Sequence, residues 1–388
     1  MGDDTPSPLN NVITIDDDRI KSHLDRVVRG SVEETLNALP HFYFYLPPSA
    51  PSEYYPHDLP RTIDSHWKSL SSQDDIDSGK FVWTLQTYLH LKADWTVQTY
   101  LHLRADGFPC ELASSLPSEG IVLAHRDFFP DDLKPGPKIL LVCILADREG
   151  PGLAGRHPYA QLHVVQNPRD PRLTKPTKAW PAYYMPYWPQ PGLIPRDSRR
   201  RDRFEVAAYF GHEDNLAPEL RSASWRDCLH DLGLAWRLVP RERWHDHSDV
   251  DVVVAVRGFD QNDYPYKPPS KLHNAWHAGI PAVLGRESAY QASRKRDLDY
   301  LEVSSVDDVV SALKRLRDDP GLRRAMAENG HVRAAETTPN RLVGLWRDFL
   351  LNEAVPAYEK WRTAPRSGRS TFMMQRHLAR HRELRRHL

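Results

Sequence analysis

Two lysines, Lys267 and Lys271, flank a short segment in which Ser270 follows two prolines and Gly279 stands near the end. The prolines disfavour helix before Ser270, so we expect Ser270 to cap a helix that ends at Gly279. The first N–H groups of a helix have no partner within it and carry partial positive charge. With a lysine on either side, this helix start is predicted to bind an anion. Taken alone, the segment also fits an ordinary helix that leads into a strand.

Gly211, Arg257 and Glu287 each follow an apolar run that is typical of a buried strand. Arg257 offers a cation for a phosphate, and Gly211 would let the backbone approach a ligand closely. Glu287 could bind ligand hydroxyls, or simply sit favourably in the first turn of a helix. Ligands of parallel sheets bind beyond the carboxyl ends of the strands, so we expect these residues to share a site.

His125 and Asp127, in the first half of the chain, stand at the end of a strand predicted at residues 120–125. An imidazole or a carboxylate in such a place can take the proton of a substrate hydroxyl. Both residues are therefore candidate catalytic bases. The alternative for a single histidine at a strand end is a structural role.

Metal and dinucleotide chemistry have no support in the sequence. His245 with His247, and His273 with His277, lack a convincing set of further ligands, so no metal site is predicted. The chain has no Gly-x-Gly-x-x-Gly and no Walker motif, which argues against hydride transfer and ATP chemistry.

The elements that must hold these residues alternate between strand and helix in both halves of the chain. Strands are predicted at residues 41–46, 109–113, 120–125, 138–145, 160–166, 204–211, 235–239, 250–257, 282–284 and 300–303. Helices are predicted at residues 19–38, 221–232, 270–279, 288–295, 306–316, 321–328 and 340–361. We therefore predict an α/β protein with two doubly wound, Rossmann-like domains that face one another across a cleft.

Residues 83–94 and 95–106 are almost identical in sequence. A step of this length rotates a helix face by about 120°, so both copies cannot point the same side chains at one core. We interpret the repeat as a tandem duplication in which the second copy keeps the original packing and the first is a surface insertion. His90 and His102 are then no metal pair.

Composition divides the chain further. We expect a mobile acidic lead-in at residues 1–20 and a first domain at residues 21–180. A crossing at residues 181–203 leads to a second domain at residues 204–340, and a last helix follows at residues 341–361. The crossing is rich in proline and aromatic residues, ends in a run of arginines, and is predicted to contain no regular structure.

The tail at residues 362–388 holds eight arginines and one glutamate. It fits either a solvated end or a basic amphipathic helix that makes a peripheral contact with an anionic membrane.

The whole chain has 52 basic and 52 acidic residues, so no overall field points to nucleic acid. Its three cysteines are widely spaced, as expected of reduced thiols in a cytoplasmic protein. No early apolar run resembles a signal peptide, and no apolar stretch is long enough to span a membrane. We expect a cytoplasmic protein whose route to a membrane surface, if it has one, is the tail.

The second half of the chain resembles the GT-B glycosyltransferases. The resemblance rests on Pro-x-Ser-Lys-Leu-x-Asn-Ala-x-x-Ala-Gly-Ile-Pro at residues 268–281, on Phe210-Gly211 and Arg257 after two strands, and on residues 299–303 and 316–330. It covers residues 204–350 well. The first half resembles the family in the order of its strands and helices.

The resemblance implies that the second domain holds a sugar donor, usually a nucleotide sugar, and that the first holds the acceptor. Lys271 and Arg257 are then the expected ligands of the donor diphosphate. The other expected donor ligands are Gly211, Lys267, Ser270, Asn274 and Glu287, and His125 and Asp127 lie on the acceptor side.

One departure from the family concerns Tyr266 and Asn274. Retaining members of the largest GT-B group carry glutamates at these two positions, and both carboxylates are missing here. Asn274 can still form a hydrogen bond with a ribose or sugar hydroxyl.

The predicted function is metal-independent transfer of a sugar from a nucleotide-sugar co-substrate to a hydroxyl of a glycan or a small-molecule acceptor, with no other cofactor. Two alternatives stay open. One is a sugar-nucleotide epimerase of the same build, and the other is a non-catalytic binding protein of this fold, which the missing glutamates and the duplication favour.

Overall fold

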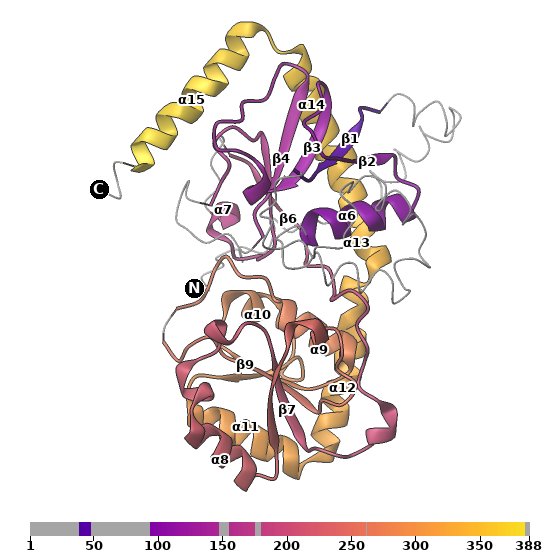
Figure 1. Ribbon diagram of the computed structural model, residues 1–388, viewed down its shortest axis with the longest axis vertical. Helices are drawn as coiled ribbons and strands as arrows, with labels where there is room; N and C mark the ends of the chain where they lie inside the picture. The colour runs from indigo at the N-terminus through magenta and orange to yellow at the C-terminus, as the bar shows by residue number, and fades with distance from the viewer. Residues whose placement is uncertain (1–38, 48–93, 147–154, 175–179, 261, 385–388) are drawn as a thin grey trace, which may run out of the picture. The chain divides into compact units, whose positions relative to one another are not determined.

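A computed structural model of the protein describes residues 39–47, 94–146, 155–174, 180–260 and 262–384. Its first sheet is parallel throughout, with the strand order β2-β1-β3-β4-β5-β6 (Figure 1). The strands are β1 (Phe42–Tyr45), β2 (Cys110–Ala113), β3 (Gly120–His125), β4 (Ile139–Ile144), β5 (Leu162–Val165) and β6 (Ala182–Tyr184). The first five lie within segments that the sequence predicts as strands.

Strands β3 and β4 are central in this sheet, and their composition explains why. Every residue of β3 is buried, and β4 is buried from its second residue to its last. The two strands pair in register, with Val122 opposite Leu141. Because both faces of such a strand are covered, apolar residues are needed at every position instead of at alternate ones.

Helix α6 (Asp94–Ala105) is the second copy of the repeated sequence, and it packs against β1, β2 and β3. Its residues 96–103 are all buried. The ring of Tyr100 lies 5.9 Å from that of Phe44, and His102 stacks on Trp188 at 4.4 Å. Residues 83–93 of the repeat, the predicted helix at 19–38 and the acidic lead-in lie outside the described residues.

The second sheet is also parallel and has the strand order β11-β10-β9-β7-β8. Its strands are β7 (Val206–Phe210), β8 (Ala235–Val239), β9 (Val252–Ala255), β10 (Ala282–Gly285) and β11 (Leu301–Val303). Its helices are α8 (Ala223–Asp231), α9 (Ser270–Ala278), α10 (Ser288–Ser293), α11 (Val306–Asp318) and α12 (Pro320–Ala334). The prediction of an α/β protein with two parallel sheets is confirmed.

Strand β6 corrects the prediction that the Pro-rich stretch contains no regular structure. It adds to the edge of the first sheet beside β5. The N–H of Met185 donates to the carbonyl of Val165, and the carbonyl of Pro181 accepts from the N–H of His163. The prolines flank this three-residue strand and do not interrupt it, which an edge strand tolerates.

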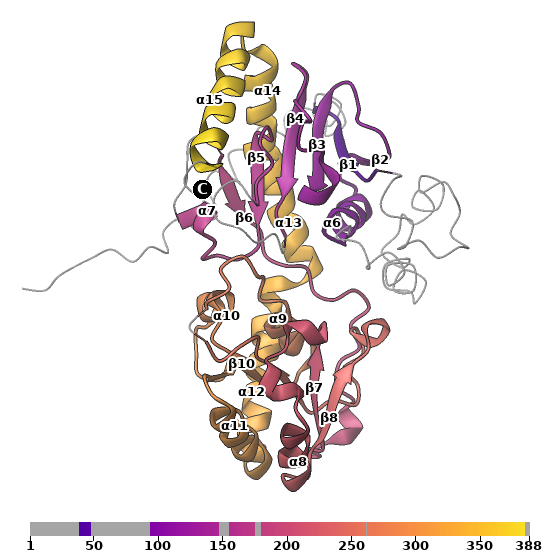
Figure 2. The same ribbon diagram turned by 60° about the vertical axis from the view of Figure 1, so that its left-hand side comes forward.

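The chain returns to the first sheet in α13 (Pro339–Phe349) and α14 (Val355–Thr363), which the π-helical turn η9 (Leu350–Ala354) joins. Helix α13 packs against α6, and α14 packs against β3 and β4 (Figures 1 and 2). Trp361 of α14 donates from Nε1 to the carbonyl of Gly136 at 2.8 Å. The sequence predicts one helix here. Pro356 lacks the N–H that regular α-helical bonding would need, so a wider turn precedes it.

Most of the basic tail forms helix α15 (Arg366–Leu384). Of the two structures left open for the tail, a solvated end and a helix, the structure shows the helix. Arg376 is 1% exposed, and its guanidinium lies 4.8 Å from the ring of Trp180 and 4.4 Å from that of Phe372. Burial, and the nearby charge of Arg156, lower the pKa of Arg376 to about 8. One arginine of the tail is therefore part of the interior. Among the described residues, no helix is both long enough and apolar enough to cross a membrane.

Candidate functional site

The carboxyl ends of β7, β9 and β10 lie next to one another, because these strands are neighbours in the second sheet. Arg257 follows β9 and Glu287 follows β10, and their side chains form an ion pair at 3.2 Å. The two side chains are 12% and 3% exposed. Arg257 also donates from Nη1 to Oδ1 of Asn215 at 3.0 Å. These bonds hold the guanidinium in one orientation at the sheet edge.

Tyr209 of β7 connects this pair to Lys271. The ammonium of Lys271 lies 5.4 Å from the centre of the Tyr209 ring, within range of a cation–π contact. Burial raises the pKa of Tyr209 to about 12, while the charge of Arg257 acts to lower it and that of Glu287 to raise it. Tyr209 therefore lies near both the Arg257–Glu287 pair and Lys271. The sequence gives no signal for Tyr209, since a buried tyrosine in a strand is ordinary.

Gly211 follows β7, and the space that a side chain would need there is already occupied. A Cβ atom at Gly211 would lie 2.6 Å from the hydroxyl oxygen of Tyr209. That hydroxyl donates to the carbonyl of His212 at 3.2 Å, which folds the tyrosine back against the turn. Glycine at position 211 therefore leaves room for the Tyr209 side chain. The close approach of a ligand to Gly211 stays a prediction.

Helix α9 begins at Ser270, but the expectation that Ser270 caps it is wrong. Pro269 occupies the cap position, with φ −80° and ψ 33°, and no side chain bonds the first N–H groups. The chain turns into the helix one residue earlier than predicted, so the Ser270 hydroxyl lies inside the first turn. The helix start consequently keeps its partial positive charge, with Lys271 beside it.

Lys267 belongs to a tight turn before α9, in which its N–H donates to the carbonyl of Tyr264 at 3.0 Å. Tyr264 has a φ of 48°, a left-handed conformation that is strained for a bulky residue. Its ring lies 5.8 Å from the guanidinium of Arg257. Sequence reasoning missed Tyr264, because backbone strain at a site leaves no mark in residue type.

Tyr266 and Asn274, which stand where the family resemblance would place glutamates, both have partners in the protein. Oδ1 of Asn274 accepts a hydrogen bond from the N–H of Gln190 at 3.0 Å. The ring of Tyr266 lies 4.8 Å from the guanidinium of Arg172. Asn274 therefore links α9 to the Pro-rich stretch, and a bond to a sugar hydroxyl would fall to its Nδ2 group.

His125, at the end of β3, is fully buried and engaged at both ring nitrogens. Nε2 lies 2.9 Å from the carbonyl oxygen of Ala146, and Nδ1 accepts from the N–H of Asp127 at 3.2 Å. Because a backbone N–H can only donate, these partners assign the proton to Nε2. The N–H of His125 donates to Oγ1 of Thr96 at 3.0 Å. His125 thus caps the short 3₁₀ helix η3 (Arg126–Phe128).

Asp127 lies in the first turn of η3, and its residue is exposed. Its carboxylate is 3.7 Å from Nδ1 of His125. The structure therefore brings the two predicted acceptor-side residues together but gives them different surroundings, since the side chain of Asp127 is 22% exposed and that of His125 is fully buried.

A buried polar group after β5 was not singled out from the sequence. Asp170 and Arg172 are 1% and 2% exposed, and Nε of Arg172 donates to Oδ1 of Asp170 at 2.8 Å. Asn167 donates from Nδ2 to Oγ of Ser288, the residue that follows Glu287. The position of this segment directly after a buried strand was the signal that could have found it.

Among the described residues, no group of three or more His, Cys, Asp or Glu side chains could hold a metal ion. Of the histidines considered above, His273 is stacked on Trp276 with ring centres 5.2 Å apart, and His247 is stacked on Phe210 at 3.9 Å. Burial lowers the pKa of His273 to about 3 and that of His247 to about 4. Both are therefore neutral at pH 7 and part of the packing.

No protein-family model and no curated protein matches the chain. Among solved structures, the chain is similar to HepE of Anabaena in complex with UDP-glucose, at 11% identity over 81% of this chain and 100% of that one, with a TM-score of 0.44. It is similar to sucrose-phosphate synthase from Thermosynechococcus elongatus at 13% identity over 69% and 80% of the two chains, with a TM-score of 0.41. It is also similar to WaaG, a glycosyltransferase involved in lipopolysaccharide biosynthesis, at 14% identity over 66% and 82%, with a TM-score of 0.40.

The structure itself shows two parallel α/β sheets, as the sequence resemblance to the GT-B glycosyltransferases implies. Likenesses at these identities and TM-scores say nothing of the activity. The chemistry has to be argued from the residues at the sheet edges.

Proposed function

We propose that the protein is a glycosyltransferase that moves a sugar from a nucleotide-sugar donor to a hydroxyl of a glycan or a small-molecule acceptor, without a metal ion. One observation carries this proposal. The Arg257–Glu287 pair holds a guanidinium at the edge of the second sheet, and Lys271, in the first turn of the uncapped helix α9, lies with its ammonium 5.4 Å from the ring of Tyr209 in the neighbouring strand β7. Two held cations and a helix N-terminus suit a diphosphate leaving group.

In the proposed reaction, the bond between the anomeric carbon of the sugar and the donor phosphate breaks. Negative charge then develops on the phosphate, and Lys271 and Arg257 stabilise it together with the first N–H groups of α9. Lys267, in the turn before α9, and the Ser270 hydroxyl, in the first turn of α9, add further contacts. The remaining proposed donor contacts are the carboxylate of Glu287, Nδ2 of Asn274 and the backbone at Gly211.

On the acceptor side, we assign the proton-accepting role to Asp127, because its carboxylate is reached from solvent. His125 acts through the turn that it caps, by bonding the N–H of Asp127, and is therefore a positioning residue. The acceptor hydroxyl would give its proton to Asp127 as its oxygen attacks the anomeric carbon.

Donor binding tests the proposal most directly. Isothermal titration calorimetry of the full chain with a panel of UDP-, GDP- and dTDP-sugars should identify one that binds. Lys271→Ala should weaken that binding by about ten- to a hundredfold, as expected for a lost charge-assisted contact to phosphate. The control is Lys314→Ala, which removes an exposed lysine from α11 and should leave the affinity unchanged. Unchanged affinity in Lys271→Ala would show that the phosphate assignment is wrong.

Product analysis separates the alternatives that share this donor site. A sugar found on an acceptor, with release of the nucleotide diphosphate, supports transfer. A donor whose sugar has changed configuration supports the epimerase. Failure of every nucleotide sugar in the panel to bind would favour the non-catalytic binding protein of this fold.

We further propose that α15 rests on an anionic membrane surface. Met374 and Leu378, one turn apart, are 57% and 47% exposed on a helix that carries several arginines. Apolar side chains among cations suit the boundary between headgroups and acyl chains. The double variant M374S/L378S should release the protein from vesicles that contain phosphatidylserine, measured by cosedimentation; retention of the variant would contradict the proposal.

A further inference from the structure

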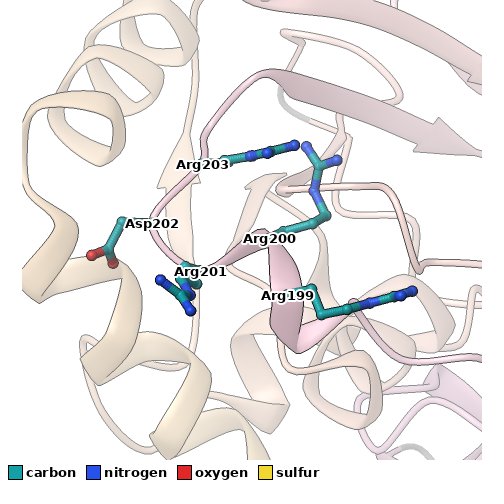
Figure 3. A pocket seen from close by; sticks show the side chains of 5 residues that line it. All are labelled: Arg199, Arg200, Arg201, Asp202 and Arg203. Carbon is teal, nitrogen blue, oxygen red and sulfur yellow. The ribbon is translucent and has the colours of Figure 1, made fainter.

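Residues 199–203, here called the arginine loop, line an open hollow of about 480 Å³ before β7 (Figure 3). Four of the five residues are arginines, and the fifth is Asp202. In Figure 3 the side chains of Arg200 and Arg203 point toward one another, and that of Arg199 points away from them. The proposed glycosyl transfer makes no use of this loop.

A buried aspartate fixes one side of the arginine loop. Asp251 is 2% exposed and accepts from Nε and Nη2 of Arg200 at 2.9 and 2.7 Å, and from the same atoms of Arg196 at 3.0 and 2.8 Å. Arg196 also donates to the carbonyl of Arg203 at 2.8 Å. Two arginines therefore hold the loop in shape, and the hollow exists before any ligand arrives.

The other side of the loop is tied through Asp202. Its carbonyl accepts from Nη2 of Arg323 at 2.8 Å, and its carboxylate accepts from Nη1 of Arg324 at 2.6 Å. Arg201, next to it, has φ 45° and ψ −125°, which a residue with a side chain rarely adopts. Strain of this kind persists where the surroundings impose it, and it gathers at binding sites.

Arg201 and Arg203 bring charges that the loop does not neutralise. Both residues are exposed, and neither pairs with a carboxylate in the part of the chain that the structure describes. Arg199 pairs with Asp197, but its own side chain is 89% exposed. The hollow therefore carries a positive field that is open to solvent.

The hollow is separate from the candidate donor site. The arginine loop precedes β7 and Gly211 follows it, so the length of a five-residue strand, roughly 16 Å, lies between them. A ligand in the hollow is therefore not the diphosphate assigned to Lys271.

We propose that the arginine loop is a second binding site, specific for phosphate groups. Guanidinium groups bind phosphate oxygens through two parallel hydrogen bonds, and several of them in a preformed loop bind a polyphosphate or a phosphorylated compound. The phosphate belongs either to a soluble compound or to a lipid headgroup.

The test uses inorganic tripolyphosphate as the probe, in calorimetry of the full chain at low ionic strength. The wild type should bind it, and the affinity should fall with added salt because the arginines are exposed. The double variant R201G/R203S removes both charges, relieves the backbone at Arg201, and should weaken binding by about tenfold or more. R201K/R203K keeps the charges but not the paired hydrogen bonds, so it should bind more weakly than the wild type and more tightly than R201G/R203S.

Arg226→Ser is the matched control, since Arg226 is an exposed arginine on α8 outside the arginine loop. If R201G/R203S binds tripolyphosphate with the affinity and stoichiometry of the wild type, the ion is held elsewhere and the proposal is wrong. If R201G/R203S binds one tripolyphosphate ion fewer per chain than the wild type, and Lys271→Ala loses a different one, the protein has two distinct phosphate sites.

A second arm identifies the source of the phosphate. Cosedimentation with vesicles of phosphatidylcholine and phosphatidic acid is compared between the wild type and R201G/R203S. If the wild type binds the vesicles but not tripolyphosphate, and the double variant loses the vesicle binding, the phosphate belongs to a lipid headgroup. If the wild type binds tripolyphosphate but not the vesicles, and the double variant loses that binding, the phosphate belongs to a soluble compound. Binding of neither probe by the wild type overturns the proposal.

Discussion

The polar residues at the carboxyl ends of the two sheets differ in what surrounds them. At the second sheet, Arg257 and Glu287 neutralise one another, and Lys271 lies half-buried over an aromatic ring. At the first sheet, His125 is fully buried, with both nitrogens bonded to the protein's own chain. A polar residue that follows an apolar strand can thus be a charged group held by an ion-pair partner, as Arg257 is, or a buried group whose hydrogen bonds stabilise a turn, as those of His125 do.

The largest effect should follow from breaking the pair at the second sheet. Arg257→Ala leaves the carboxylate of Glu287, which is 3% exposed, without its cation, and the loss of one partner from a buried pair costs about 3–5 kcal/mol. Urea unfolding measures the change. The double variant R257M/E287M should recover most of the stability while donor binding stays lost. If it is as unstable as the single variant, the ion pair is not what matters at this edge.

At the first sheet, the next largest effect should fall on stability instead of on catalysis. His125→Ala removes a cap and one further buried hydrogen bond, that of Nε2 to the carbonyl of Ala146, and should cost about 2 kcal/mol in thermal or urea unfolding. Asp127→Asn should leave stability unchanged and lower kcat by about a hundredfold or more. A stable His125→Ala protein that has lost its turnover would reverse the two roles.

Low pH should lower the free energy of unfolding in both parts of the chain, because the first and the second sheet region each bury neutral histidines. Burial lowers the pKa of His273, in α9, to about 3, with the charges of His277 and Arg333 acting in the same direction. Burial likewise lowers the pKa of His157, before β5, to about 4. An unfolded histidine has a pKa of about 6.5, so the unfolded chain binds the proton first as the pH falls.

The stability that each histidine contributes is therefore complete above about pH 6.5 and is lost toward the folded pKa, with roughly 2 kcal/mol lost by pH 5. His273→Phe, which keeps the stacking on Trp276, should flatten the dependence of the unfolding free energy on pH between about 7 and 5. The same slope in the variant and the wild type would mean that His273 takes up its proton in the folded state.

The smallest effect should come from Gly211→Ala, which pushes against the Tyr209 hydroxyl at 2.6 Å. Because that atom is the end of a side chain, the tyrosine can move, and the cost should be about 1 kcal/mol. Removing the hydroxyl in G211A/Y209F should restore part of the thermal stability, because Cζ of the ring, 2.8 Å from the added Cβ, must still move. If the double variant gains nothing over Gly211→Ala, the hydroxyl of Tyr209 does not set the requirement for glycine.

Most of the fold could be predicted because the central strands carry their own signal. Residues 138–145 and 250–257 are apolar runs too short for helices, and they become β4 and β9. Strand β6 gave no such signal, since its pairing depends on the open edge of β5 and its prolines argue against a strand. Helix α15 was left undecided because its anchor, Trp180, lies far away in sequence.

The candidate site could be predicted at the level of residue types and strand ends, as for Arg257 and Glu287. What could not be predicted depends on neighbours brought in by folding. The asparagine that fixes Arg257, Asn215, comes from a separate turn, and the strain at Tyr264 exists only in the folded backbone. The burial of His125 likewise depends on Thr96 and Ala146, which lie on other elements.

The return of the chain to its first sheet has a consequence for the order of synthesis. The second sheet and its helices are complete by residue 334, whereas β3 and β4 wait for α14, which begins at residue 355. A ribosome that has made the second sheet still carries a first sheet with part of its apolar face uncovered. We expect arrested chains that end before residue 339 to be cut by protease within residues 94–184 and to resist cleavage within residues 206–334. Equal protection of both regions would show that the first sheet closes without its last helices.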